Sequence, residues 1–285
     1  MKRRIATLFK LFFLTFITLT ILGCDYKLFD PKGPIADTQM TLIIASALIM
    51  LIVVIPVIIM GIWFPIRYRS KNRNQEYKPD WEHSNKIEVV VWAIPILIIA
   101  VLGTITYITS YSLDPRRPIE SDKPTMVVQV VAMDWKWLFI YPEYGIATVN
   151  ETALPVNVPV EYLVTSDTVM NSFFIPNLGT QIYAMSGMEN RLHLMATEKG
   201  IYPGFSSNYS GFGFSGMKFS AIAKSQQAFN QWVENIKQSA NPLDDDAFAE
   251  LRIKSKDVPP THFSYVDPLL FSNIIEKYVG ALNGE

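Results

Sequence analysis

The sequence has 285 residues, and its 25 Lys and Arg against 26 Asp and Glu give a net charge of −1 at pH 7. A chain without clustered basic residues lacks the electrostatic footprint of a nucleic-acid-binding protein, and one cysteine can form neither an internal disulfide nor a cysteine-based metal site. Hydrophobic residues make up 49% of the chain and are concentrated in three N-terminal stretches, whereas the part after about residue 115 is typical of a soluble domain.

The first stretch resembles a secretory signal. Three basic residues in the first four positions precede an apolar run over residues 11–22, which is shorter than the roughly 20 residues that a spanning helix needs. The run ends in ILGC, similar to a bacterial lipoprotein cleavage site. We therefore expect residues 1–23 to be a lipoprotein-type signal peptide and Cys24 to carry lipid at the mature N-terminus. The alternative is a free cysteine at a membrane boundary.

Two longer uncharged runs, residues 41–64 and 89–111, predict transmembrane helices. The linker between them, residues 65–88, carries six Lys or Arg, whereas the segment 24–40 carries two. Because positive charge is enriched on the cytoplasmic side, the linker is predicted to be cytoplasmic. The sequence thus predicts a multi-pass protein of the bacterial inner (plasma) membrane, with segment 24–40 and the C-terminal domain in the periplasm or cell exterior.

One acidic residue, Glu88, directly precedes the second apolar run at the predicted cytoplasmic edge. It has two interpretations. An exposed carboxylate near a helix N-terminus is favoured by the helix dipole. An ionisable group at the membrane boundary, facing a partner helix, is also typical of a proton-entry site.

The outer domain begins with short alternating runs separated by turns, which predict a β-sandwich over residues 125–224. The strand-like runs are 125–132, 158–167, 191–197 and 217–223. The region 225–285 is predicted to be helical, with Phe229, Trp232, Val233 and Ile236 on one face of a first helix and a second helix over 267–282. The stretch between these helices has the composition of a linker. Trp135, Trp137, Phe139 and Tyr141 are interpreted as strand and core residues, and His193 as a structural residue.

This order of elements resembles subunit II of the haem-copper oxidases, a membrane-anchored, mainly β protein with a two-helix hairpin and a cupredoxin-like domain. Copper-bearing members hold a dinuclear centre in a Cys-x3-Cys-x3-His-x2-Met loop, with a Glu carbonyl in it and a second His from an earlier strand. The present chain keeps that spacing with Ser206 and Ser210 at the cysteine positions, Asn208 at the Glu, Phe214 and Asn171 at the histidines, and Met217 retained. Because such a copper pair needs thiolates and imidazoles, no metal is expected in this domain.

The segments MDWKWLFIYPE, VMNSFFIP and YSGFGFSGMKF are most similar to the cytochrome bo type of ubiquinol oxidase. The resemblance implies a non-redox subunit of a proton-pumping complex that converts ubiquinol and oxygen to ubiquinone and water. It implies haems and one copper in a partner subunit I, smaller subunits III and IV, quinol reached through subunit I, and no cytochrome c partner. It also associates the Glu88 position with the cytoplasmic mouth of a proton path. The alternatives are a haem aa type menaquinol oxidase, a scaffold lipoprotein without an oxidase partner, and a membrane-anchored copper protein.

Overall fold

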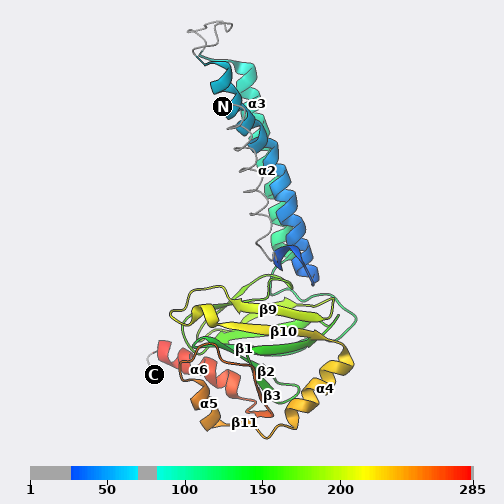
Figure 1. The fold of residues 1–285 in the computed structure, drawn as a ribbon, viewed down its shortest axis with the longest axis vertical. Coiled ribbons are helices and arrows are strands. Elements are labelled where there is room, and N and C mark those ends of the chain that lie inside the picture. The colour runs from blue at the N-terminus through cyan, green and yellow to red at the C-terminus, as the bar shows by residue number, and fades with distance from the viewer. Residues whose placement is uncertain (1–26, 70–81, 284–285) are drawn as a thin grey trace, which may run out of the picture.

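A computed structural model describes residues 27–69 and 82–283 of the chain. It consists of a long two-helix hairpin attached to a β-sandwich (Figure 1). The predicted signal peptide, Cys24 and half of the predicted cytoplasmic linker lie outside the described residues.

The hairpin is formed by α2 (Pro34–Arg67) and α3 (Asn85–Ser112), and the short η1 (Lys27–Phe29) precedes it. Both helices extend beyond the apolar runs from which they were predicted. α2 begins earlier because Gly33 is extended and Pro34 occupies the first turn, where its missing N–H costs no helical hydrogen bond. The most apolar windows of α2 and α3 have mean hydropathies of 3.3 and 2.6, with 0% and 6% of their residues buried. Apolar helices exposed to this extent are unlike the core helices of a soluble protein.

Two mixed sheets form the sandwich. The six-stranded sheet contains, in spatial order, β12 (Thr261–Phe263), β3 (Ile146–Val149), β2 (Lys136–Tyr141), β1 (Met126–Met133), β5 (Val160–Ser166) and β8 (Asn190–Leu194). The five-stranded sheet contains β4 (Glu151–Pro155), β10 (Lys218–Lys224), β9 (Gly200–Ser206), β6 (Asn171–Phe174) and β7 (Ile182–Ala184). β1 pairs in parallel with β5, in the register Gln129↔Leu163, and β10 pairs in parallel with β4. The four predicted strands correspond to β1, β5, β8 and β10.

Aromatic side chains fill the space between the sheets. Phe173 and Phe219 stack with ring centroids 5.1 Å apart, and Trp137 packs edge-on against Phe173 at 5.4 Å. Trp137, Phe139 and Tyr141 are fully buried, so their interpretation as core residues is confirmed. Such aromatic pairs stabilise the sandwich through both buried area and ring geometry.

The C-terminal region begins with α4 (Gln226–Lys237), whose apolar face packs into the core between the two sheets. The elements β11 (Pro242–Leu243), α5 (Asp245–Leu251), β13 (Tyr265–Val266) and α6 (Leu270–Asn283) then cover the outer face of the six-stranded sheet, and β12 joins the edge of that sheet. All four residues of the predicted apolar face of α4 are buried. Below, residues 238–283 are called the arm.

The prediction that the stretch between the two C-terminal helices is a linker is wrong. Asp244 caps α5 by accepting a hydrogen bond from the Ala247 N–H at 2.9 Å, and β12 extends the six-stranded sheet by pairing with β3. Leu243, Phe263 and Val266 are buried, because they pack against apolar side chains on the outer face of that sheet. Because the stretch is mostly polar, its sequence did not indicate that these three side chains are buried.

Candidate functional site

The loop between β9 and β10 meets the start of β6 at one end of the sandwich. β9 and β6 are neighbours, with Phe173 paired to Ser206. The Ser206 hydroxyl donates a hydrogen bond to Asn171 Oδ1 at 3.1 Å, and the Ser206 N–H donates to the Met217 carbonyl at 3.2 Å. The structure thus brings together positions 171, 206 and 217, which the family resemblance singles out.

The amide groups of the loop are also engaged. Asn171 is fully buried, and its Nδ2 donates to the Val169 carbonyl at 2.9 Å. Asn208 Nδ2 donates to the Met170 carbonyl at 3.0 Å. The Asn208 bond ties the loop to the segment before β6, whereas the Asn171 bond fixes the side chain within that segment.

The side chains of the remaining two positions of the pattern, Ser210 and Phe214, form no hydrogen bond with Asn171 or Ser206. The Phe214 ring packs edge-on against Tyr209 at 5.6 Å, and the buried Ser210 hydroxyl has no hydrogen-bond partner among the described residues. Met217 is fully buried in the core between the sheets.

This donor set does not fit a dinuclear copper centre. A hydroxyl, an amide and one core thioether provide neither bridging thiolates nor imidazoles. The best-placed oxygen atoms, on Ser206 and Asn171, already bond to one another. In the described ranges 27–69 and 82–283, no group of three or more His, Cys, Asp or Glu side chains could hold a metal ion.

Trp135 differs from its predicted role as a core residue. It is half-buried and has a φ of +63°, a conformation that is uncommon for a bulky residue. Its indole N–H donates to the Ser210 carbonyl at 3.0 Å, and a Cβ at Gly213 would lie 2.3 Å from its ring. Only glycine allows this approach, so Trp135 and Gly213 together hold the shape of the loop.

Replacing Ser206 by Ala is expected to destabilise the sandwich by about 1–3 kcal/mol, because it leaves the buried Asn171 Oδ1 without a donor. Thermal unfolding of the purified full chain, followed by tryptophan fluorescence, measures this. The neighbouring Ser207 is exposed, so Ser207→Ala is the matched control and should change stability by less than about 0.5 kcal/mol. Equal melting of the two variants would show that the Ser206 contact is not structural.

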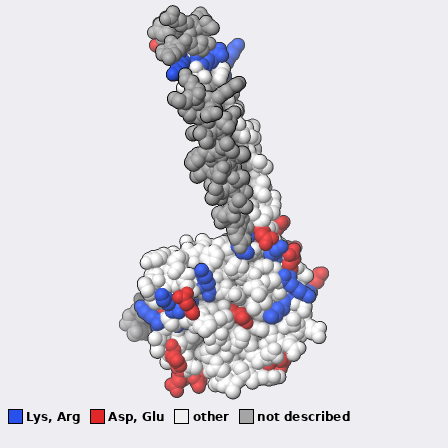
Figure 2. All heavy atoms as spheres, viewed as in Figure 1, with Lys and Arg blue, Asp and Glu red and all other residues white. Residues whose placement is uncertain are grey.

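At the other end of the molecule, Glu88 lies in the first turn of α3. Its N–H donates to the Ser84 carbonyl at 3.0 Å, its side chain is 53% exposed, and its Oε2 lies 3.5 Å from His83 Nε2. Figure 2 shows Lys and Arg atoms gathered at this end of the hairpin, remote from the sandwich. Both interpretations of Glu88, as a helix-terminal acid and as a proton-entry group, agree with this position.

Asp167 is an important residue that was not singled out from the sequence. Its carboxylate is 3% exposed and bonds to Arg252 Nε at 2.8 Å and to Lys277 Nζ at 2.7 Å. Its carbonyl accepts a hydrogen bond from the Tyr278 hydroxyl at 2.7 Å. One residue after β5 therefore fixes both the end of α5 and the α6 helix.

A buried lysine also connects the sandwich to the C-terminal end of α5. Lys136 Nζ donates to the carbonyls of Leu251 and Ile253, both at 2.7 Å. These carbonyls lie at the C-terminal end of α5, where a cation is favourable. Burial lowers the pKa of Lys136 from its usual value.

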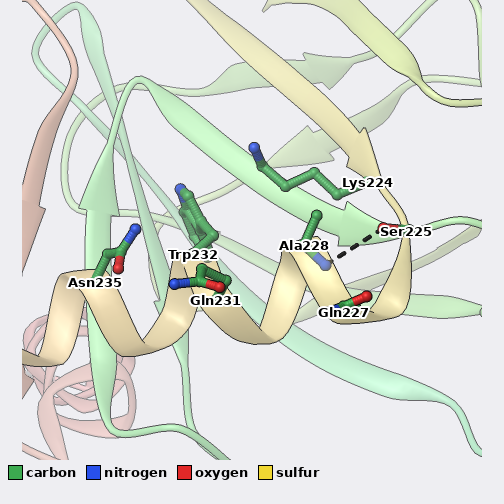
Figure 3. A pocket seen from close by; sticks show the side chains of 7 residues that line it. All are labelled: Lys224, Ser225, Gln227, Ala228, Gln231, Trp232 and Asn235. Carbon is green, nitrogen blue, oxygen red and sulfur yellow. Dashed lines mark hydrogen bonds between the residues drawn. The ribbon is translucent and has the colours of Figure 1, made fainter.

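A shallow hollow of ≈ 420 Å³ lies beside α4. Figure 3 shows Gln227, Gln231 and Asn235 on successive turns of the helix, and the Ser225 cap that accepts a hydrogen bond from the Ala228 N–H. The seven lining residues include one ionisable side chain, Lys224, and no pair of a nucleophile and a base. This hollow therefore has no catalytic arrangement.

Family models match two parts of the chain. "Cytochrome C oxidase subunit II, periplasmic domain" matches residues 144–223, and "COX Aromatic Rich Motif" matches residues 237–281. The cytochrome bo(3) ubiquinol oxidase subunit 2 of Pseudomonas aeruginosa is 54% identical over 92% of this chain and 81% of its own length. The chain belongs to the ubiquinol oxidase subunit 2 family. The ubiquinol oxidase subunit 2 of Acetobacter aceti is 52% identical over 91% of the chain and 85% of its length.

Membership in the ubiquinol oxidase subunit 2 family confirms the resemblance found in the sequence. The quinol oxidase subunit 2 of Bacillus cereus is 37% identical over 86% of this chain and 87% of its own length. Because the relatives of higher identity carry the ubiquinol name, the menaquinol and scaffold alternatives are not favoured. The aromatic-rich match coincides with the arm that Asp167 fixes to the sandwich.

Proposed function

We propose that this chain is the non-redox subunit II of a proton-pumping terminal oxidase that oxidises ubiquinol and reduces oxygen to water. The observation that supports this most directly is the Ser206–Asn171 hydrogen bond, at positions where copper-bearing relatives have a thiolate and an imidazole. Without an electron acceptor in the sandwich, electrons reach oxygen through the haems and the one copper of subunit I. Cytochrome c then has no role as a partner.

The chain serves this complex as an anchoring and docking module in the inner membrane, with the sandwich in the periplasm. The exposed apolar surfaces of α2 and α3 support this, since they suit lipid and the helices of partner subunits. Subunit I and the smaller subunits III and IV are the proposed partners. A lipid on Cys24 adds an anchor at the mature N-terminus.

Glu88 takes part in proton uptake at the cytoplasmic mouth of a path that subunit I completes. Its exposed carboxylate at the rim of α3, beside His83, supports this role. A carboxylate there captures protons from water and passes them to the membrane interior.

Affinity purification of the tagged full chain from its native membrane, followed by an absorption spectrum, tests the proposal. The expected product contains further subunits and haem bands, and consumes oxygen when ubiquinol is supplied. A haem-free chain that is isolated alone would instead support the scaffold interpretation.

A further inference from the structure

A second hollow, of ≈ 350 Å³, lies where the hairpin meets the sandwich. The first turn of α2, the end of α3 and the segment after α3 form its walls. Ile35, Leu113 and Ile119 provide apolar surface, and Arg117 and Glu120 provide charge. None of these residues has a role in the proposed oxidase function.

Within the part of the chain that the structure describes, the charged residues of this hollow are exposed and contact each other only loosely. Arg117 Nη2 and Glu120 Oε1 are 3.9 Å apart, and their side chains are 56% and 95% exposed. An exposed pair at this distance is held weakly. Figure 2 shows other acidic and basic atoms gathered at the same junction, in contrast to the uncharged described surface of the hairpin shaft.

The position of the hollow at the end of the apolar helices suits the level of the lipid headgroups. Tyr107 and Tyr111, both 67% exposed, pack edge-on in the last turns of α3, and exposed aromatic residues mark the interface between hydrocarbon and water. α3 ends at Ser112, so Arg117 follows a short distance beyond this interface. Exposed apolar side chains of α2 and α3, among them Ile43, Ile44 and Ile108, offer a surface along which acyl chains can lie.

We propose that this hollow binds a phospholipid whose headgroup carries both a phosphate and a primary ammonium, as in phosphatidylethanolamine. The phosphate contacts the Arg117 guanidinium, which suits phosphate oxygens in charge and geometry. The ammonium donates hydrogen bonds to the Glu120 carboxylate. A choline headgroup has no N–H to donate, and a glycerol headgroup has no cation, so both leave Glu120 without a partner.

Lipid retention by the purified, fully assembled complex tests the site. The complex is stripped with detergent, exposed to equal amounts of phosphatidylethanolamine, phosphatidylcholine and phosphatidylglycerol, and its bound lipids are counted by mass spectrometry per haem. The wild type is expected to retain phosphatidylethanolamine in preference. Arg117→Gln should lower this retention by about fivefold, the effect of one interfacial cation, while Lys123→Gln, an exposed change in the same segment, should leave it unaltered.

Glu120→Gln separates the two contacts. It should keep lipid phosphate bound and abolish the preference for ethanolamine over choline. The haem spectrum of each variant reports assembly separately, so a failure of the lipid site is distinguishable from a failure of the oxidase assignment. A wild type without preference among the three lipids, or unchanged retention in an assembled Arg117→Gln complex, would overturn the proposal.

Discussion

A chain that ends at Lys237, and so lacks the arm, is expected not to form a stable sandwich. The arm covers the outer face of the six-stranded sheet, where Val131, Met133, Leu138, Ile140 and Val149 are buried. Burying each such side chain contributes about 1.5–3 kcal/mol, so exposing all of them removes an amount comparable with the whole stability of a domain, about 5–15 kcal/mol. Circular dichroism and limited proteolysis of the truncated chain measure the loss.

Point changes in α6 test the same prediction without truncation. Phe271 is 4% exposed, so Phe271→Ala should cost about 3–5 kcal/mol, whereas the nearby Leu269 is 62% exposed and Leu269→Ala should be nearly neutral. A folded truncated chain, or equal melting temperatures for the two variants, would show that the arm is not part of the folding unit.

Replacing Glu88 by Gln is expected to slow oxygen reduction by roughly tenfold, equivalent to about 1.4 kcal/mol in the barrier, while assembly stays normal. The amide keeps the size of the side chain but neither captures nor releases a proton. Because protons in water become scarcer as pH rises, the deficit should grow towards alkaline pH. Ubiquinol-driven oxygen consumption per haem, measured across pH, gives this result.

The control for Glu88 is Glu82, another exposed carboxylate on the same side of the hairpin but outside the helix. Glu82→Gln should leave turnover unchanged. If a fully assembled Glu88→Gln complex consumed oxygen at the wild-type rate, Glu88 would be a helix-terminal acid and nothing more.

The hairpin and the main strands were predictable because their signals are local. Long uncharged runs indicate spanning helices whatever surrounds them, and two-residue alternation indicates half-buried strands. The helix boundaries were less accurate, because the polar ends of α2 and α3 depend on Gly33, Pro34 and Ser84 at the first turns and not on hydrophobicity.

The arm was only partly predictable because its anchors are distant in sequence. β12 pairs with a strand more than a hundred residues earlier, and Asp167 contacts Lys277 across a sequence separation of 110. Contacts between residues so far apart produce no periodic pattern of hydrophobic residues in the sequence. Polar residues around Leu243 and Phe263 made the segment resemble a linker, although these two side chains bury against the sheet.

Positions 171, 206 and 217 lie together in the structure, which agrees with the family resemblance that singled them out. The resemblance did not predict what these residues do once copper ligands are absent. The Ser206–Asn171 hydrogen bond depends on rotamers, and the contact between Trp135 and Gly213 depends on a positive φ at Trp135. The sequence does not specify either feature directly.

We infer that the sandwich keeps the scaffold of a copper-bearing domain without its metal centre. Metal analysis of the assembled, haem-containing complex measures this. We expect one copper per complex, located in the partner subunit, and none released when the sandwich alone is proteolysed from it. Two further copper ions bound near Asn171 and Ser206 would contradict it.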